Sequence, residues 1–360
     1  MKKALIAMSG GVDSSVAACL MKERGYLCTG CTMRLYENDL IGEDLLSTCC
    51  SLKDTKDARG VCERLGINYR IYHYEREFLE EVVDPFVRSY EQARTPNPCI
   101  DCNRRMKFGI LFDRMRAEGM DVLVTGHYAR IAYDEESGRY LLKKGKDPSK
   151  DQSYVLYQMT QEQLAATAFP LGEYTKEEAR QIAAERGFQN AEKADSQDIC
   201  FIPDGDYAGF IETYTGKRFP KGDFVGTDGK KIGEHKGIIH YTIGQRKGLG
   251  IASEAPYYVT KIDPASNRVT LSHGEGLFSN KVVAHNINLI SVPSVSGEMR
   301  VAAKIRYRQV EQPGILTQPD PDTLCMVFDE PQRAATPGQS LVIYDGDTVV
   351  GGGIISAEPS

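Results

Sequence analysis

The sequence lacks a long apolar segment. No stretch of the 360-residue chain reaches the roughly 18 consecutive apolar residues that a transmembrane helix requires. The apolar run from Ala4 to Met8, which follows Lys2 and Lys3, is also too short for the core of a signal peptide. We therefore expect a cytoplasmic protein with no membrane contact.

An excess of positive charge is also missing. The chain has 44 Lys and Arg against 50 Asp and Glu, which gives a net charge of -6. A nucleic-acid partner would therefore have to bind local basic patches, and the sequence offers two, at residues 143–150 and 304–308. The ten cysteines occur in a long chain without an export signal, so most should be reduced thiols rather than a disulfide framework.

A Walker phosphate loop is absent, because no Gly-Lys-Ser/Thr follows the glycines near the N-terminus. Instead, Ser9-Gly10-Gly11-Val12-Asp13-Ser14-Ser15 stands between a predicted strand at 3–8 and a helix that begins near Ser14. Loop amides and a helix N-terminus can converge on a phosphate, and hydroxyls of Ser9, Ser14 and Ser15 can add donors. We expect Asp13 to help hold Mg²⁺. The competing interpretation is an ordinary serine-rich turn before a helix.

The first part of the chain alternates strands with helices. Strands are predicted at 26–35, 68–74 and 121–125, with helices around 78–90 and from Asn103. This alternation predicts an α/β domain with a doubly wound parallel sheet, which we place at residues 1–203.

Beyond Cys200 helical periodicity fades and short β-rich runs appear at 282–292, 300–310 and 323–328. Asp345-Gly346 between two further apolar runs indicates a hairpin. We therefore expect a C-terminal β-barrel at 282–360, and between the two domains a small central domain at 204–276 whose fold the sequence does not specify.

Two cysteines precede the helix predicted from Asn103. Cys99 and Cys102 flank Ile100-Asp101, with Arg104, Arg105 and Lys107 close behind. A thiol at a helix N-terminus beside cations should react as the thiolate, so Cys102 is a candidate nucleophile. Cys200 stands in Ser196-Gln197-Asp198-Ile199-Cys200-Phe201, where the α/β texture ends.

Six motifs in order complete a resemblance that covers nearly the whole chain. They are the phosphate loop at 9–15, Thr-Pro-Asn-Pro with Cys-Asn-Arg and Lys-Phe-Gly (95–109), Thr-Gly-His-Tyr-Ala (125–129), Lys-Asp-Gln-Ser-Tyr (150–154), Ser-Gln-Asp-Ile-Cys-Phe-Ile (196–202) and Thr-Ile-Gly-Gln-Arg-Lys-Gly-Leu-Gly (242–250). The phosphate loop resembles that of the ATP pyrophosphatase (PP-loop) superfamily, which cleaves ATP between the α and β phosphates. Together the motifs resemble the tRNA-specific 2-thiouridylase family.

The resemblance implies a reaction at the wobble uridine of tRNA. ATP adenylates the C2 oxygen, and sulfur carried as a cysteine persulfide then displaces AMP. By matching position, Cys200 carries the persulfide and Cys102 is the second catalytic cysteine, closing a disulfide with it as sulfur leaves. The sulfur donor is a persulfide-carrying protein, a cysteine desulfurase or sulfide.

The resemblance also assigns binding residues. The residues implied for ATP and Mg²⁺ are Ala7, Met8, Ser9, Gly10, Gly11, Val12, Asp13, Ser14, Ser15, Met33 and Gly126. Those implied for tRNA are Asn97, Pro98, His127, Lys150, Asp151, Gln152, Arg306, Tyr307 and Gln339. A solvated loop position is the competing interpretation of each single tRNA residue.

Position 99 departs from the form of the family that is usually used to explain the mechanism. That form has an aspartate at this position, to which a role as general acid or base is assigned. Asp101 could take that work only if the chain turned it inward. Alternatively, Cys99, Cys102 and Cys200 are three ligands of a 4Fe-4S cluster whose open iron holds a sulfide. Zinc and an incidental pair are further interpretations of the Cys-x-x-Cys spacing.

Two other classes of function compete with tRNA thiolation. A PP-loop ligase or amidotransferase that adenylates a small molecule shares the phosphate loop, but it needs neither the distant cysteines nor a small barrel. A non-catalytic RNA-binding or metal-scaffold protein leaves the phosphate loop unexplained.

Overall fold

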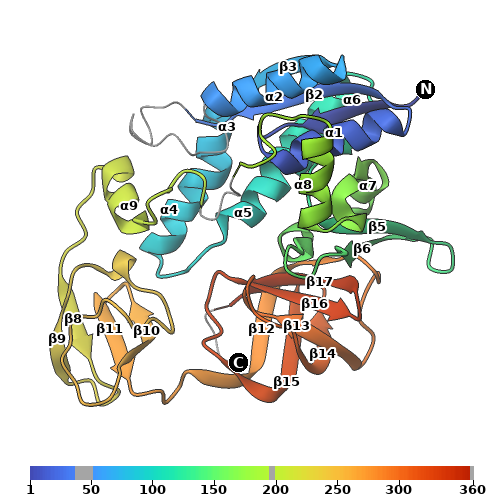
Figure 1. Ribbon diagram of the computed structural model, residues 1–360. Coiled ribbons are helices and arrows are strands. Elements are labelled where there is room, and N and C mark those ends of the chain that lie inside the picture. The colour runs from blue at the N-terminus through green and yellow to red at the C-terminus, as the bar shows by residue number, and fades with distance from the viewer. Residues whose placement is uncertain (37–51, 194–198, 357–360) are drawn as a thin grey trace.

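In the computed structural model, which describes residues 1–36, 52–193 and 199–356, a parallel sheet organises the first part of the chain (Figure 1). Its five strands lie in the order β3-β2-β1-β4-β7. The strands are β1 (Lys3–Ala7), β2 (Leu27–Arg34), β3 (Asn68–His73), β4 (Val122–Val124) and β7 (Thr167–Ala168). Ala4, Leu5 and Ile6 are fully buried, as expected where helices cover both faces of a parallel sheet.

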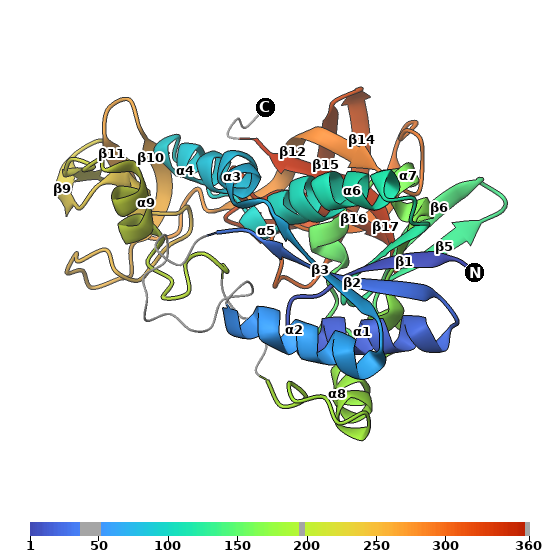
Figure 2. The ribbon, with the colours of Figure 1, turned by 90° about the horizontal axis from the view of Figure 1, so that it is seen from above.

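Helices lie on both sides of the sheet, so the predicted doubly wound fold is confirmed (Figure 2). One side carries α1 (Val12–Glu23), α2 (Leu52–Leu65) and α8 (Lys176–Glu185). The other carries α3 (Glu75–Phe78), η2 (Leu79–Val83), α4 (Asp84–Glu91), α5 (Pro98–Asp101), η3 (Cys102–Leu111) and α6 (Phe112–Ala117). The chain continues through η4 (Ser153–Leu156), α7 (Gln161–Ala165) and η5 (Pro170–Glu173). None of the helices in the described ranges is long and apolar enough to cross a bilayer.

The helix expected from Asn103 begins earlier, at Pro98. The Asn97 side chain accepts a hydrogen bond from the backbone N–H of Cys99 (3.1 Å), and Pro98 occupies the first helical position, where no N–H is needed. Cys99 and Cys102 therefore lie inside the first turns of the helix rather than before it. Residues 102–111 continue with π-type hydrogen bonds, a geometry often found at functional sites.

A hairpin that the sequence did not indicate joins the first domain to the C-terminal barrel. It consists of β5 (Ala129–Asp134) and β6 (Arg139–Lys144), and β6 pairs with the last strand of the chain, Lys143 opposite Thr348. The Asp347 carboxylate binds Arg130 (2.9 Å) and Lys143 (3.2 Å) and so fastens the same edge.

The central part of the chain forms a small sheet preceded by one helix, α9 (Tyr207–Thr215). Its strands lie in the order β10-β11-β8-β9. They are β8 (Gly222–Val225), β9 (Lys231–His235), β10 (Tyr258–Asp263) and β11 (Arg268–Ser272), and a short turn, η6 (Ile238–His240), follows β9.

The expected C-terminal β-barrel is confirmed. Six strands run in the order β12-β15-β14-β13-β16-β17, and β12 pairs with β17 to close the ring. They are β12 (Phe278–Leu289), β13 (Met299–Lys304), β14 (Gln312–Asp320), β15 (Thr323–Arg333), β16 (Ser340–Asp345) and β17 (Thr348–Ile355). The hairpin predicted at Asp345-Gly346 joins β16 to β17, and Gly346 supplies the positive φ (59°) that this turn needs.

One strand of the barrel is shorter than expected. The run 300–310 was predicted as a strand, but β13 ends at Lys304. The Gln309 side chain accepts the backbone N–H of Ile305 (3.0 Å), and the Gln309 N–H donates to the Arg306 carbonyl (3.2 Å), which closes a turn. Arg306 and Tyr307 therefore project from a turn at the barrel edge.

All three parts of the chain meet at Thr95. Its N–H donates to the Pro337 carbonyl (2.9 Å), and its carbonyl accepts the Gln339 carboxamide (2.8 Å), both from the barrel. Its hydroxyl lies 3.3 Å from that of Thr242 in the central domain. The segment leading into the cysteine helix is thus tied to both neighbouring domains.

The buried hydroxyl of Tyr154 adds a further tie, because it donates to the Ser340 carbonyl at 2.8 Å. Tyr154→Phe should lower the free energy of unfolding by about 1 kcal/mol, since this hydrogen bond is lost in the interior. Urea unfolding measures the change. Tyr133→Phe, at an exposed tyrosine, is the control and should change little. Equal stability of the two variants would contradict the proposed tie.

Candidate functional site

The glycine loop connects β1 to α1 in a fixed conformation. Gly10 has φ +75°, and a Cβ added to it would lie 2.7 Å from the Cα of Asp54, so only glycine fits. The Ser14 and Ser15 hydroxyls both donate to the Gly11 carbonyl at 3.0 Å. These two buried serines therefore shape the loop from within, whereas the sequence suggested that they donate to phosphate. Ser9 remains exposed beside them.

Two residues that the sequence analysis missed support the loop from below. The Asn190 carboxamide donates to the Gly10 carbonyl and to the Ser15 hydroxyl, each at 2.9 Å. Lys193 reaches the same carbonyl at 3.3 Å while pairing with Asp54 and with Asp57. No local motif marks these residues, because they follow the loop by about 180 positions.

The Asp13 carboxylate, which was expected to help hold Mg²⁺, has protein partners. Lys176 Nζ lies 2.8 Å from each of its oxygens, and the Tyr128 hydroxyl donates to one of them at 2.7 Å. Tyr128 lies in the Thr-Gly-His-Tyr-Ala motif, whereas Lys176 belongs to none of the predicted motifs. Both carboxylate oxygens of Asp13 therefore already accept hydrogen bonds from the protein.

The other residues assigned to the nucleotide gather at the carboxyl edge of the sheet. Ala7 ends β1 and is paired with Cys31 on β2, two positions before the buried Met33. A Cβ on Gly126 would lie 2.8 Å from the backbone N of Ser14, so this glycine allows the segment after β4 to touch the start of α1. In a parallel doubly wound sheet this edge is where ligands bind.

The three predicted sulfur residues are placed differently. Cys99 is exposed, whereas Cys102 and Cys200 are half-buried and pack against the same hydrophobic cluster. The Tyr36 hydroxyl donates to the Cys200 carbonyl at 3.4 Å. Residues 194–198, which include the first three residues of the Cys200 motif, lie outside the described ranges.

A preassembled metal site is not present in the described part of the chain, because no three His, Cys, Asp or Glu side chains gather as ligands there. Cys99, Cys102 and Cys200 therefore do not fit an iron-sulfur cluster in this conformation.

Asp101 lies on the same helix turn as the two cysteines. Burial raises its pKa to about 6, an effect that Arg104 and Arg105 oppose and Glu81 reinforces. Its carboxyl group can therefore exchange a proton near neutral pH.

Several residues assigned to tRNA are held by the protein itself. The Asp151 carboxylate accepts the N–H groups of Gly145 (3.0 Å) and Ser153 (3.2 Å), and the Gln152 side chain accepts the Tyr128 N–H (3.0 Å). His127 is buried, and burial together with Lys107 lowers the pKa of its imidazole well below the usual value. A neutral, buried His127 cannot pair with a phosphate, so its place is beneath the surface.

Two of the tRNA candidates contact each other, and a third is held by the barrel. The Tyr307 hydroxyl donates to the Asp151 carbonyl at 3.4 Å. Burial raises the pKa of Tyr307, and the charges of Asp151 and Cys99 add to the effect. The Arg306 guanidinium binds the Ala334 carbonyl (2.7 Å) and the Thr336 hydroxyl (3.1 Å).

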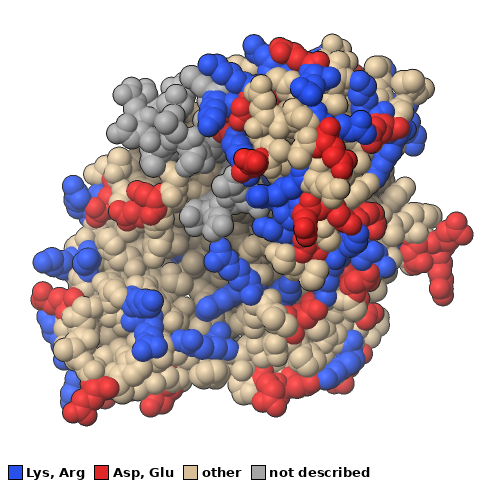
Figure 3. Space-filling model, in the orientation of Figure 1, with Lys and Arg blue, Asp and Glu red and all other residues tan. Residues whose placement is uncertain are grey.

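Ion pairs offset much of the charge of the first basic patch predicted from the sequence, at residues 143–150. Lys143, Lys144 and Lys146 pair with Asp347, Glu311 and Glu178, which neutralises much of the first patch. Figure 3 nevertheless shows Lys and Arg side chains gathered in the middle of one face, where the first domain meets the two β-rich domains. A polyanion would be attracted to this junction despite the acidic overall charge.

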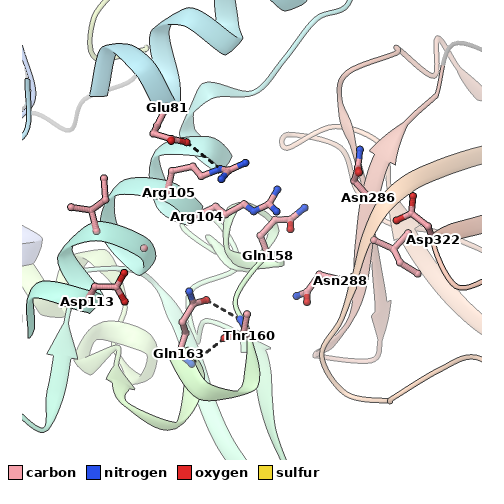
Figure 4. Close-up of a pocket in the computed structure, with 13 residues that line it drawn as sticks. Glu81, Arg104, Arg105, Asp113, Gln158, Thr160, Gln163, Asn286, Asn288 and Asp322 are labelled. Carbon is pink, nitrogen blue, oxygen red and sulfur yellow. Dashed lines mark hydrogen bonds and ion pairs between the residues drawn. The ribbon is translucent and has the colours of Figure 1, made fainter. Parts of the chain in front are cut away.

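A separate cavity of about 540 Å³ opens between the helix that carries Cys102 and the barrel (Figure 4). Arg104 and Arg105 face it from the helix, and Asn286 and Asn288 face it from β12. Glu81, Asp113 and Asp322 balance the arginines, and none of the residues assigned from the sequence lines it. The cavity is therefore distinct from the candidate site and does not favour one sign of charge.

Comparison with known proteins covers the whole chain. Three family models match in succession: a tRNA methyl transferase HUP domain over residues 2–204, a tRNA methyl transferase PRC-barrel domain over 208–273 and an aminomethyltransferase beta-barrel domain over 279–355.

Curated relatives match at similar length. A protein of Clostridioides difficile is 48% identical over 98% of both chains, and one of Lachnoclostridium phytofermentans is 47% identical over 99% of both. One from a Thermoanaerobacter species is 49% identical over 97% of this chain and 96% of its own. The first two are named tRNA-specific 2-thiouridylase MnmA, and the third tRNA-specific 2-thiouridylase MnmA 2.

Gly10→Ala tests the phosphate loop. The added methyl group collides with the backbone of Asp54, so the loop must move and nucleotide affinity should fall at least about tenfold through lost loop geometry. Gly25→Ala is the matched control, because Gly25 has a similar φ (+81°) but open space around it. It should cost only about 1 kcal/mol of stability. Calorimetric titration with ATP measures both, and unchanged affinity in Gly10→Ala would refute the assignment.

Proposed function

Because the chain belongs to the tRNA-specific 2-thiouridylase family, we propose that it is an ATP-dependent sulfurtransferase that replaces the C2 oxygen of a tRNA wobble uridine with sulfur. The observation that carries the proposal is the rigid glycine loop at the carboxyl edge of a doubly wound sheet, in a chain whose relatives match over nearly its full length. A small-molecule PP-loop ligase is the weaker alternative, since it would share the loop but not the other two domains.

The first half of the reaction is adenylation. The uridine C2 oxygen bonds to the α phosphorus, the uridine loses its N3 proton, and pyrophosphate leaves with the electrons of the α–β bridge. The loop amides and the N-terminus of α1 hold the phosphates, and Gly10, which has no side chain, keeps the loop amides accessible. Mg²⁺, with Asp13 as a ligand, would neutralise charge on the phosphates. Adenylation is needed because a uridine oxygen leaves poorly, whereas AMP leaves readily.

The second half delivers sulfur. In the persulfide route the terminal sulfur on Cys200 attacks C2 and AMP departs. The Cys102 thiolate then attacks the inner sulfur, which leaves the outer sulfur on the base and joins the two cysteines in a disulfide. External thiols must reduce this disulfide, and a persulfide-carrying protein or cysteine desulfurase recharges Cys200. Cys102 is half-buried just after the first helical turn, and Arg104 and Arg105 follow it in the sequence, which supports a role for its thiolate.

The alternative sulfur route is sulfide bound to a 4Fe-4S cluster. It would require the exposed Cys99 and the half-buried Cys102 and Cys200 to move together. Asp101 supports the persulfide route, because a carboxyl group with a pKa of about 6 can exchange a proton near neutral pH.

We further propose a division of labour among the domains. Residues 1–203 would carry the ATP and sulfur chemistry, and 282–360 would bind tRNA together with the central domain at 204–276. The surface candidates for tRNA are Asn97, Pro98, Lys150, Arg306, Tyr307 and Gln339, whereas His127, Asp151 and Gln152 would act by shaping the loops beside them.

Cys200→Ser separates the two halves of the reaction. Release of pyrophosphate in the presence of tRNA should persist within about twofold, because the phosphate loop is untouched, while thiolated uridine should fall below detection since a hydroxyl cannot carry a persulfide. A radiolabelled pyrophosphate assay and mass spectrometry of digested tRNA give the two readouts. Normal thiolation by the variant would sink the sulfur assignment, and a wild-type enzyme without tRNA-dependent pyrophosphate release would sink the function.

Cys99→Ala distinguishes the two sulfur routes. With Cys200 as persulfide carrier, the variant should retain at least about a third of wild-type thiolation, because an exposed side chain is lost and no acid or base is removed. The assay is run anaerobically with a persulfide donor, alongside iron and sulfide analysis of the wild type. Cys325→Ala, at a barrel cysteine outside the candidate site, is the control. Stoichiometric iron in the wild type with collapse of thiolation in Cys99→Ala would establish the cluster instead.

A further inference from the structure

Lys176 lies beside the phosphate loop without belonging to it. Residues 9–15 contain no Lys or Arg, although Walker loops carry a lysine for the β and γ phosphates. Lys176 Nζ lies 2.8 Å from both carboxylate oxygens of Asp13, and its side chain is only 10% exposed. The loop itself has no lysine, and a lysine from another helix lies beside it.

Contacts on every side fix the position of Lys176. It occupies the first position of α8, where Thr175 and Glu178 form a capping box, and its backbone N–H donates to Asp147 at 3.0 Å. Its ammonium group lies 5.9 Å from the centre of the Tyr128 ring, whose hydroxyl binds the same Asp13. Little side-chain entropy remains to be lost when this group meets a ligand.

A purely structural role does not account for this ion pair. Removing two charges from water costs free energy, and an apolar pair of similar size is often as stable. Asp13 also lies in the first turn of α1, where the helix dipole already favours a carboxylate. The ion pair is better explained as a resting arrangement, in which Asp13 binds the lysine until a more highly charged anion replaces it.

We propose that Lys176 is a catalytic residue that contacts the β phosphate of ATP and stabilises pyrophosphate as it leaves. The inference rests on the proposed function. As the bond between the α phosphorus and the bridging oxygen breaks, the electron pair and negative charge pass to pyrophosphate. Lys176 keeps its proton throughout and donates hydrogen bonds to that charge, and Asp13, released from the ion pair, turns to the cation that accompanies the phosphates.

Binding of the two products tests the contact separately from turnover. In Lys176→Met the affinity for pyrophosphate with Mg²⁺ should fall at least about tenfold, because a charge-assisted hydrogen bond is lost, while AMP affinity should stay within about twofold. Lys176→Arg should recover most of the pyrophosphate affinity. Lys146→Met is the control, since Lys146 pairs with Glu178 on the surface of the same helix. Calorimetric titration measures all four proteins.

A double-mutant comparison removes the structural explanation. If Lys176 merely orients Asp13, Lys176→Met should cause no further loss of pyrophosphate affinity in an Asp13→Asn background, and that result would overturn the proposal. If Lys176 touches phosphate, the loss of about tenfold should persist there. The comparison also serves if Lys176→Met alone fails to fold, because the double variant leaves no unpaired carboxylate. If the wild-type protein thiolates tRNA but Lys176→Met has the same pyrophosphate affinity as the wild type, the proposed contact of Lys176 is refuted. The proposed function of the protein would still stand.

Discussion

The docking of Thr95 against two neighbouring domains is the constraint on which the geometry of the sulfur site depends. Its hydrogen bonds to Pro337, Gln339 and Thr242 fix the chain two residues before the Asn97 cap from which the cysteine helix starts. A shift of the barrel would therefore also shift the helix that carries Cys99 and Cys102. The surface proposed to receive tRNA and the helix that performs sulfur chemistry thus share one mechanical link.

The phosphate loop is stabilised in another way, by groups that arrive late in the chain. Asn190 and Lys193 hold Gly10 from below, and Lys176 holds Asp13 from the side. The loop conformation is consequently set before any nucleotide binds, and the free-energy cost of ordering it is met during folding rather than during catalysis. This preorganisation explains why buried serines in the loop donate to its own carbonyl group.

Local pattern was sufficient for part of this architecture. The strand before Ser9, the helix after Val12 and the Asp345-Gly346 hairpin follow from periodicity and turn chemistry over a few residues. The helix begins at Pro98 rather than near Asn103, because Asn97 caps it and Pro98 fits its first position, signals that a prediction based on the cysteines does not use. Lys176 could not be assigned in advance, since its partner Asp13 is 163 positions away. The burial of His127 likewise arises from packing against Phe108 and Phe169, which no motif reports.

The pairing of β6 with β17 has a consequence for biosynthesis. Lys143 leaves the ribosome long before its partner Thr348, which lies 205 residues further along the chain. At about 5 to 20 residues per second, the edge of the β5–β6 hairpin waits roughly 10 to 40 seconds for its neighbour. During that interval the nascent first domain exposes an unpaired strand, which is a ready template for association with other chains. Lys143 and Lys144 lie near the end of that strand, and they can pair with Asp347 and Glu311 only after the barrel has formed. Until then their free charges lie on the exposed edge and oppose its association with other strands.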